Sequence, residues 1–174
     1  SQGAKLVNES IESGKMYESD AWKELVANVK SKNSTMHFIG LLSDGNVHSN
    51  IKHLFNMIKK AKSEGISKVR VHALLDGRDV PPQTAQIYLE QLEDLFKELN
   101  DSTFDGKIAS GGGRMKITMD RYQADWPMVE RGWNAHVRGE GRQFSTAMDA
   151  LNTLRAETGV ASDQDLSAFV IAEN

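Results

Sequence analysis

Two apolar runs on either side of a helix-patterned segment restrict the fold of this chain more than any other feature. Met36–Leu42 and Val69–Leu75 are nearly continuous apolar runs bounded by polar residues, which is typical of strands buried on both faces. Between Ile51 and Ala61 the apolar residues recur at helical spacing instead. A strand, a helix and a second strand indicate a βαβ unit, whose strands lie parallel and are joined by a right-handed crossover.

The rest of the chain continues this alternation. Apolar periodicity predicts two helices before the first run and further helices over 83–99, from Tyr122 to Val137 and around Leu151, with short strands near Lys107–Ser110 and Ala168–Ile171. We therefore predict an α/β fold of three layers, in which a mostly parallel sheet carries helices on both faces.

The large aromatic residues and most of the histidines have simple structural interpretations. Trp22, Trp126 and Trp133 stand at helical positions and are expected to anchor the core. His37 and His72 lie inside predicted strands, where packing or hydrogen bonding is expected rather than ligand binding. The remaining pair on predicted helices, His53 and His136, has no candidate partner nearby in sequence.

Composition limits the class of protein. The chain has 174 residues, which suits one domain with a substantial core, and its net charge of -3 argues against a general nucleic-acid surface. No apolar run approaches the roughly 20 residues that cross a bilayer, so no membrane partner is expected. The absence of cysteine excludes disulfides and thiolate metal sites and suits a cytoplasmic protein. Because Ser1-Gln2-Gly3 lacks an initiator methionine and the chain stops after an apolar run, we expect a piece of a longer protein.

Three polar segments follow the predicted strands: Ser43–His48, Asp76–Asp79 and Gly111–Arg114. Loops that leave the carboxyl ends of parallel strands meet at one edge of the sheet, where ligands bind. This arrangement would bring together five side chains: His48, Asp76, Arg78, Asp79 and Arg114. Guanidinium groups beside a histidine and carboxylates suit a small phosphorylated or carboxylated substrate.

Each of these segments also has a structural alternative. His48 could simply cap a helix. Asp79 could orient Arg78, accept a proton from a substrate hydroxyl, pair with His48, or form a structural ion pair that holds its loop. The glycine run before Arg114 resembles a phosphate-binding loop, but it is neither G-x-G-x-x-G nor a Walker A sequence. Arg121 could form a surface ion pair with a neighbouring aspartate.

Three motifs in order make the chain similar to a known family. They are Gly40–Ser49, Arg70–Asp79, and Ile108–Arg114 continued through Met119–Tyr122. With these motifs the chain resembles the cofactor-independent phosphoglycerate mutases over nearly all its length, and their plant and trypanosomatid branch in particular.

The resemblance implies two α/β domains, of which residues 1–174 match only the inserted phosphotransferase domain. The other, phosphatase-like domain would carry a transiently phosphorylated serine and two divalent metals (manganese, or magnesium or cobalt), with none bound by this chain. It implies interconversion of 3-phosphoglycerate and 2-phosphoglycerate in glycolysis and gluconeogenesis, by an enzyme expected to be a monomer. The isolated domain would be inactive. A stand-alone phosphorylated-metabolite-binding module is the alternative, and a nucleotide-binding α/β module is a weaker one, since no phosphate loop with an acidic ribose partner is found.

The resemblance also implies roles for single residues. His48 would contact the substrate phosphate and take part in catalysis. Arg78, Arg114 and Arg121 would bind the phosphate and carboxylate of the substrate. Asp79 would act on the substrate hydroxyl as acid or base. A further substrate-binding Arg-Ala-Asp-Arg segment is expected beyond Asn174, and Asn46, where the family usually has glycine, is expected in a left-handed conformation.

Overall fold

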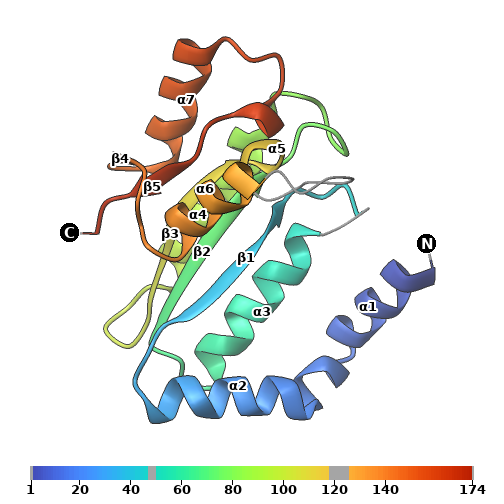
Figure 1. The fold of residues 1–174 in the computed structure, drawn as a ribbon. Coiled ribbons are helices and arrows are strands. Elements are labelled where there is room, and N and C mark those ends of the chain that lie inside the picture. The colour runs from blue at the N-terminus through green and yellow to red at the C-terminus, as the bar shows by residue number, and fades with distance from the viewer. Residues whose placement is uncertain (1, 47–49, 118–125, 174) are drawn as a thin grey trace.

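The computed structural model describes residues 2–46, 50–117 and 126–173, and in these ranges it contains a single sheet of five strands (Figure 1). The strands are β1 (Met36–Leu42), β2 (Lys68–Leu75), β3 (Asp105–Gly113), β4 (Arg142–Phe144) and β5 (Phe169–Ile171). Their order across the sheet is β1-β2-β3-β5-β4. All neighbours are parallel except β3 and β5, so the predicted α/β fold with a mostly parallel sheet is confirmed.

Helices fill the connections between the strands. They are α1 (Gln2–Glu12), α2 (Asp20–Ser31), α3 (Ile51–Ser63), α4 (Ala85–Leu99), α5 (Arg114–Ile117), α6 (Trp126–His136) and α7 (Ala147–Thr158), with short 3₁₀ turns η1 (Lys15–Glu18) and η2 (Asp163–Asp165). Ser19 and Asn50 cap α2 and α3, because their side-chain oxygens accept hydrogen bonds from the amides of Trp22 and Lys52. None of the described helices combines the length and apolar character needed to cross a membrane.

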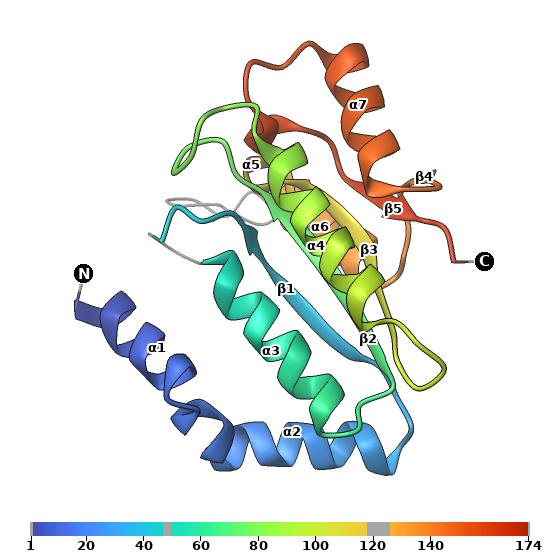
Figure 2. The same ribbon diagram turned by 180° about the vertical axis from the view of Figure 1, so that it is seen from behind.

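The two faces of the sheet are covered by different helices, which completes the three predicted layers (Figures 1 and 2). Alternate residues of β2 from Val69 to Leu75 enter the main core with side chains of α2, α3, α4 and α7. On the opposite face, Leu74 packs with Leu41 of β1 and Ile117 of α5 in a smaller cluster. Helix α6 packs on β3 and β5 on this second face.

Strand β1 differs from the prediction that it is buried on both faces. It lies at the edge of the sheet, and its residues His37, Ile39 and Gly40 are exposed. The side chain of Ile39 is 54% exposed. The reason is that α5 and α6 pack chiefly on the middle of the second face, against β2, β3 and β5, so that the edge strand is only partly covered there.

The tryptophans also divide between confirmed and wrong predictions. Trp22 is buried, packs edge-on against Tyr17 with ring centroids 5.0 Å apart, and donates its indole N–H to Glu64. Trp126 and Trp133 are 71% and 56% exposed, so they do not anchor the core. Helical periodicity identifies one face of α6 correctly as apolar, but it cannot tell which face meets the sheet.

Candidate functional site

The strand register lines up the first residue after each of the three central strands. Leu42 of β1 pairs with Leu75 of β2, which pairs with Gly113 of β3. The residues that follow are Ser43, Asp76 and Arg114, and they are hydrogen-bonded in a row. The Ser43 hydroxyl donates to Asp76 Oδ2 at 2.7 Å, and Arg114 Nη1 donates to Asp76 Oδ1 at 3.3 Å. The structure thus brings together the carboxyl ends of these strands, as expected for a parallel sheet.

Asp76 organises the loop that follows β2. Its Oδ1 accepts hydrogen bonds from the backbone amides of Gly77, Arg78 and Asp79 at 2.8, 3.0 and 3.2 Å. Burial tends to raise the pKa of Asp76, but the hydrogen bonds from the Arg78 amide, Ser43 and the other two amides outweigh it and lower that pKa. Asp76 is therefore an ionised anchor whose hydrogen bonds hold the loop after β2.

Asp79 pairs with Arg114 rather than with the arginine beside it in sequence. Arg114 Nη1 donates to Asp79 Oδ2 at 3.1 Å, and both side chains are largely buried. Among the described residues, Asp79 Oδ1 accepts no hydrogen bond, and the buried Nε of Arg114 also has no partner. The pair holds its loop, as the structural alternative suggested, yet keeps unused hydrogen-bonding capacity.

Arg78 has the opposite environment. It is exposed, and within the described ranges its guanidinium makes no hydrogen bond or ion pair, although its backbone amide is fixed by Asp76. The site therefore presents one arginine that is buried and oriented by carboxylates, and a second that is free to meet an anion from solvent.

The run Gly111–Gly113 is not a loop, contrary to its comparison with a phosphate-binding loop. It forms the end of β3, which extends beyond the predicted Lys107–Ser110. A Cβ on Gly113 would lie 2.2 Å from the carbonyl oxygen of Gln164, and one on Gly111 would lie 2.4 Å from the Phe169 ring. These glycines allow η2 and β5 to pack against the strand, and in this way they place Arg114.

Two contacts at the site had no signal in the sequence. The Tyr88 hydroxyl of α4 donates to Asp44 at 2.7 Å, and burial together with that carboxylate raises the pKa of Tyr88 to about 12. The loop after β1 also touches the loop after β2, since a Cβ on Gly45 would lie 2.7 Å from Asp79 Cβ. Asn46 has a φ of 55°, so the predicted left-handed conformation is confirmed.

Two of the predicted site residues, His48 and Arg121, lie outside the described residues. Within the described ranges, no group of three or more histidines, aspartates and glutamates is placed to hold a metal ion. The site described by Ser43, Asp76, Arg78, Asp79 and Arg114 is suited to binding an oxyanion through guanidinium groups, and Asp79 offers one carboxylate oxygen for proton exchange.

Comparison with known proteins gives a consistent set of relatives. The family described as BPG-independent PGAM N-terminus matches residues 7–174. A probable 2,3-bisphosphoglycerate-independent phosphoglycerate mutase of Leptospira interrogans is 55% identical over 173 residues, covering 99% of this chain and 32% of that protein. The corresponding mutase of Trypanosoma brucei brucei is 47% identical over 171 residues, covering 98% and 31%. The crystal structure of Leishmania mexicana phosphoglycerate mutase at low cobalt concentration matches with a TM-score of 0.95 and 42% identity, covering 99% of this chain and 31% of that one. The chain therefore spans about a third of the length of these relatives.

Proposed function

We propose that this chain, which belongs to the family of BPG-independent phosphoglycerate mutases and matches its N-terminal part, binds the phosphoglycerate in such a mutase. The proposed reaction interconverts 3-phosphoglycerate and 2-phosphoglycerate through a phosphoserine intermediate, in glycolysis and gluconeogenesis in the cytoplasm. The observation that carries the proposal is the row of Ser43, Asp76 and Arg114 beside the exposed Arg78. In that row, the residues that follow three separate strands meet at one edge of the sheet, and this edge is the proposed oxyanion site.

The substrate requirements agree with the two described arginines. A phosphoglycerate carries a phosphate and a carboxylate, and it must be held while its phosphate leaves one hydroxyl and returns to the other. A charge-assisted hydrogen bond contributes about 1.5–3 kcal/mol. Arg78 and Arg114 would hold these anionic groups without forming a covalent bond. We propose that Arg121 and His48 complete the contacts to the phosphate and carboxylate.

Asp79 is the proposed acid or base for the substrate hydroxyl. Arg114 fixes one of its oxygens, Oδ2, while Oδ1 is left without a hydrogen-bond partner among the described residues. A carboxylate that is oriented through one oxygen can accept a proton at the other and later return it. In this proposal Arg114 both binds substrate and positions Asp79.

The nucleophilic serine and the divalent metals are proposed to belong to a phosphatase-like domain outside this chain. Manganese, magnesium or cobalt would there activate the serine and stabilise the charge of the transferred phosphate. The residues of this chain would bind and orient the glycerate. We accordingly expect the isolated chain, a monomer in this proposal, to bind phosphoglycerates weakly without interconverting them.

A titration of the ¹⁵N-labelled chain with 3-phosphoglycerate tests this proposal. Amide resonances of residues 76–79 and 113–115 should move, and the Arg78→Gln variant should bind at least ~10-fold more weakly, since one charge-assisted contact is lost. Arg142→Gln is the matched control, because Arg142 is also exposed but lies on β4 and already pairs with Glu157.

Three outcomes would contradict the proposal. They are shifts confined to other loops, equal weakening by Arg142→Gln, and measurable turnover by the isolated chain in an assay of 2-phosphoglycerate formation. Binding of a mononucleotide in place of 3-phosphoglycerate would favour the nucleotide-binding alternative.

A further inference from the structure

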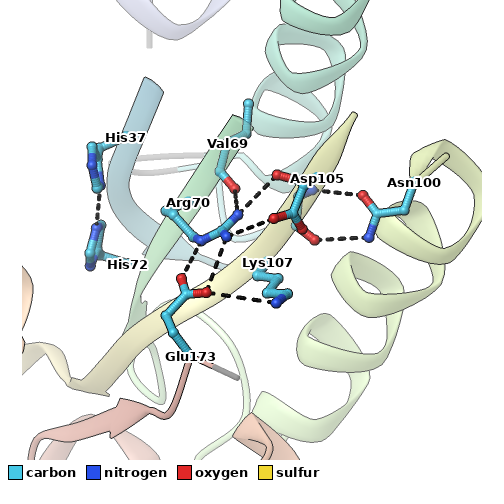
Figure 3. A network of polar contacts seen from close by, with 9 residues as sticks. His37, Val69, Arg70, His72, Asn100, Asp105, Lys107 and Glu173 are labelled. Atoms are coloured by element: carbon cyan, nitrogen blue, oxygen red, sulfur yellow. Dashed lines mark hydrogen bonds and ion pairs between the residues drawn. The ribbon is translucent and has the colours of Figure 1, made fainter. Parts of the chain in front are cut away.

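Four polar side chains form a continuous hydrogen-bonded chain across the second face of the sheet. His37 Nδ1 on β1 lies 2.9 Å from His72 Nε2 on β2. Figure 3 shows the contact between these two rings. The other ring nitrogen of His72, Nδ1, lies 2.7 Å from the Ser110 hydroxyl on β3. That hydroxyl lies 2.6 Å from His136 Nδ1 on α6. We call this set the histidine chain. Its strand residues lie within β1, β2 and β3, away from the carboxyl ends of these strands, where the candidate site lies.

The histidine chain runs from solvent into the protein. His37 is exposed on the edge strand, whereas His72 and Ser110 are 3% and 1% exposed. His136 is 8% exposed, and its Nε2 is buried without a hydrogen-bond partner in the described part of the protein. The two ends therefore differ: one can exchange protons with water, and the other cannot satisfy an added N–H.

This difference fixes the direction of the hydrogen bonds when all three rings are neutral. A neutral imidazole has one N–H donor and one acceptor nitrogen, and the tautomer is assigned from the network. A proton on His136 Nε2 would be a buried donor without an acceptor, so the proton is assigned to Nδ1 and donates to Ser110. The Ser110 hydroxyl then donates to His72 Nδ1, and His72 Nε2–H donates to His37 Nδ1. The N–H of His37, on Nε2, remains available to water.

We propose that the histidine chain is a pH-sensitive switch: when one proton is added and its charge comes to rest on His37 or His72, the Ser110–His136 hydrogen bond reverses and the ring proton of His136 stands on its buried Nε2. The Nδ1 proton of His136 passes to Ser110, the hydroxyl proton of Ser110 passes to His72, and a proton from water reaches His136 Nε2 when α6 opens locally, so the histidine chain holds four exchangeable protons before uptake and five after it. A protonated His72 donates from both nitrogens, so Ser110 must accept from it and donate to His136 Nδ1. A protonated His37 that keeps its bond to His72 has the same effect. The rings of His37 and His72 lie end to end, with centroids 5.2 Å and planes 22° apart, which is the geometry of an in-plane hydrogen bond and favours keeping it.

The surroundings keep the switch neutral above mildly acidic pH. Burial, followed by the charges of the other two rings, lowers the pKa of His72 to about 4, and burial and Arg70 lower that of His37. Burial also lowers the pKa of His136. The charged groups beside the chain are Arg70, its ion-pair partners Asp105 and Glu173, and Lys107 (Figure 3). Within the described ranges no carboxylate bonds to the three rings.

The expected consequence is local weakening of α6 in acid. The protonated state places an unpaired donor where α6 meets β3, so the attachment of the helix becomes less favourable. Because the folded histidines bind protons less readily than unfolded ones, this contribution to stability is present above about pH 6.5 and is lost as the pH falls toward about 4.

Long-range ¹H–¹⁵N correlation spectra of the 174-residue protein, which report the tautomer of each histidine ring, test the switch. At pH 8 we expect protons on His136 Nδ1 and on His72 Nε2, and on acidification the His136 proton should appear on Nε2 while His37 or His72 gains charge. Protection of α6 amides from hydrogen exchange should fall at least tenfold between pH 7 and pH 5, after correction for intrinsic rates, while α7 amides stay protected.

Variants separate the switch from general acid lability. Ser110→Ala should abolish the dependence of the His136 tautomer on pH. His53→Gln, which removes a histidine that is not part of the histidine chain, should leave that dependence intact. If Ser110→Ala does not fold, His37→Asn at the exposed end should keep the pH 8 tautomers and move the change to lower pH. A proton on His136 Nε2 at pH 8, or an unchanged His136 tautomer while His72 titrates, would overturn the proposal.

Discussion

Replacing Asp76 by asparagine tests whether this buried carboxylate holds the candidate site together. The substitution keeps the shape of the side chain and removes its charge, which three backbone amides, Ser43 and Arg114 now share. A hydrogen bond to a charged group contributes about 1.5–3 kcal/mol, against about 0.5–1.5 kcal/mol for a neutral one. Breaking a buried ion pair costs about 3–5 kcal/mol, but Arg114 would retain its contact with Asp79. We therefore expect a loss of about 3 kcal/mol in the free energy of unfolding.

Urea unfolding as a function of pH measures this loss and its electrostatic origin. Since hydrogen bonds lower the pKa of Asp76 from its ordinary value of 3.8, its stabilisation is present above that pH and is lost as the pH falls below it. The deficit of the variant should be full at pH 7 and should shrink in stronger acid. Asp94→Asn, an exposed carboxylate on α4, is the control and should change stability by no more than about 0.5 kcal/mol. Wild-type stability at pH 7, or a deficit that does not vary with pH, would refute the reasoning.

Two further substitutions probe the elements around the site. Gly113→Ala would place a Cβ 2.2 Å from the Gln164 carbonyl oxygen, so thermal unfolding should show that the free energy of unfolding falls by about 1–3 kcal/mol. Gly3→Ala is the control and should cause no comparable loss, because nothing lies within 4 Å of a Cβ at that position. Equal stability of the two variants would contradict the packing role of the glycines. Tyr88→Phe should lower the free energy of unfolding by about 1.5–3 kcal/mol, because the hydrogen bond to the Asp44 carboxylate is lost. Because the pKa of Tyr88 is raised to about 12, the contribution should persist up to pH 10 and disappear between pH 10 and about 12; ultraviolet titration in which no tyrosine titrates late would contradict it.

The parts of the fold that depend on local pattern were predictable from the sequence. The apolar runs that became β1 and β2 and the helix between them follow from spacing and residue type. The exposure of β1 could not be predicted in this way, because whether an edge strand is buried depends on which helices pack against it. The prediction that Trp126 and Trp133 anchor the core was wrong for the same reason. Periodicity gives the apolar face of a helix but not the element against which that face packs.

The candidate site was predictable in position and less so in its pairings. Parallel strands place their following residues at one edge, and this rule alone brings Asp76 and Arg114 together. It cannot give the register, which decides that Asp79 pairs with Arg114 rather than with Arg78. The Ser43–Asp76 bond could have been found by matching the first polar residue after each strand. The three motifs identified the family correctly, whereas spacing alone describes this edge only as polar.

The contrast between Arg78 and Arg114 is the strongest physical reason to place a ligand at this edge. Among the described residues, the buried Nε of Arg114 has no hydrogen-bond partner. Burying such a donor costs about 1–3 kcal/mol, and packing alone gives no reason to retain it. Natural proteins break local rules of this kind mainly where function requires it. Arg114 is held rigidly by two carboxylates, so it can fix the orientation of a bound anion, whereas the exposed Arg78 can meet an anion first and follow it. A substrate that must be held while its phosphate moves between two oxygens needs both properties, and a purely structural ion pair needs neither.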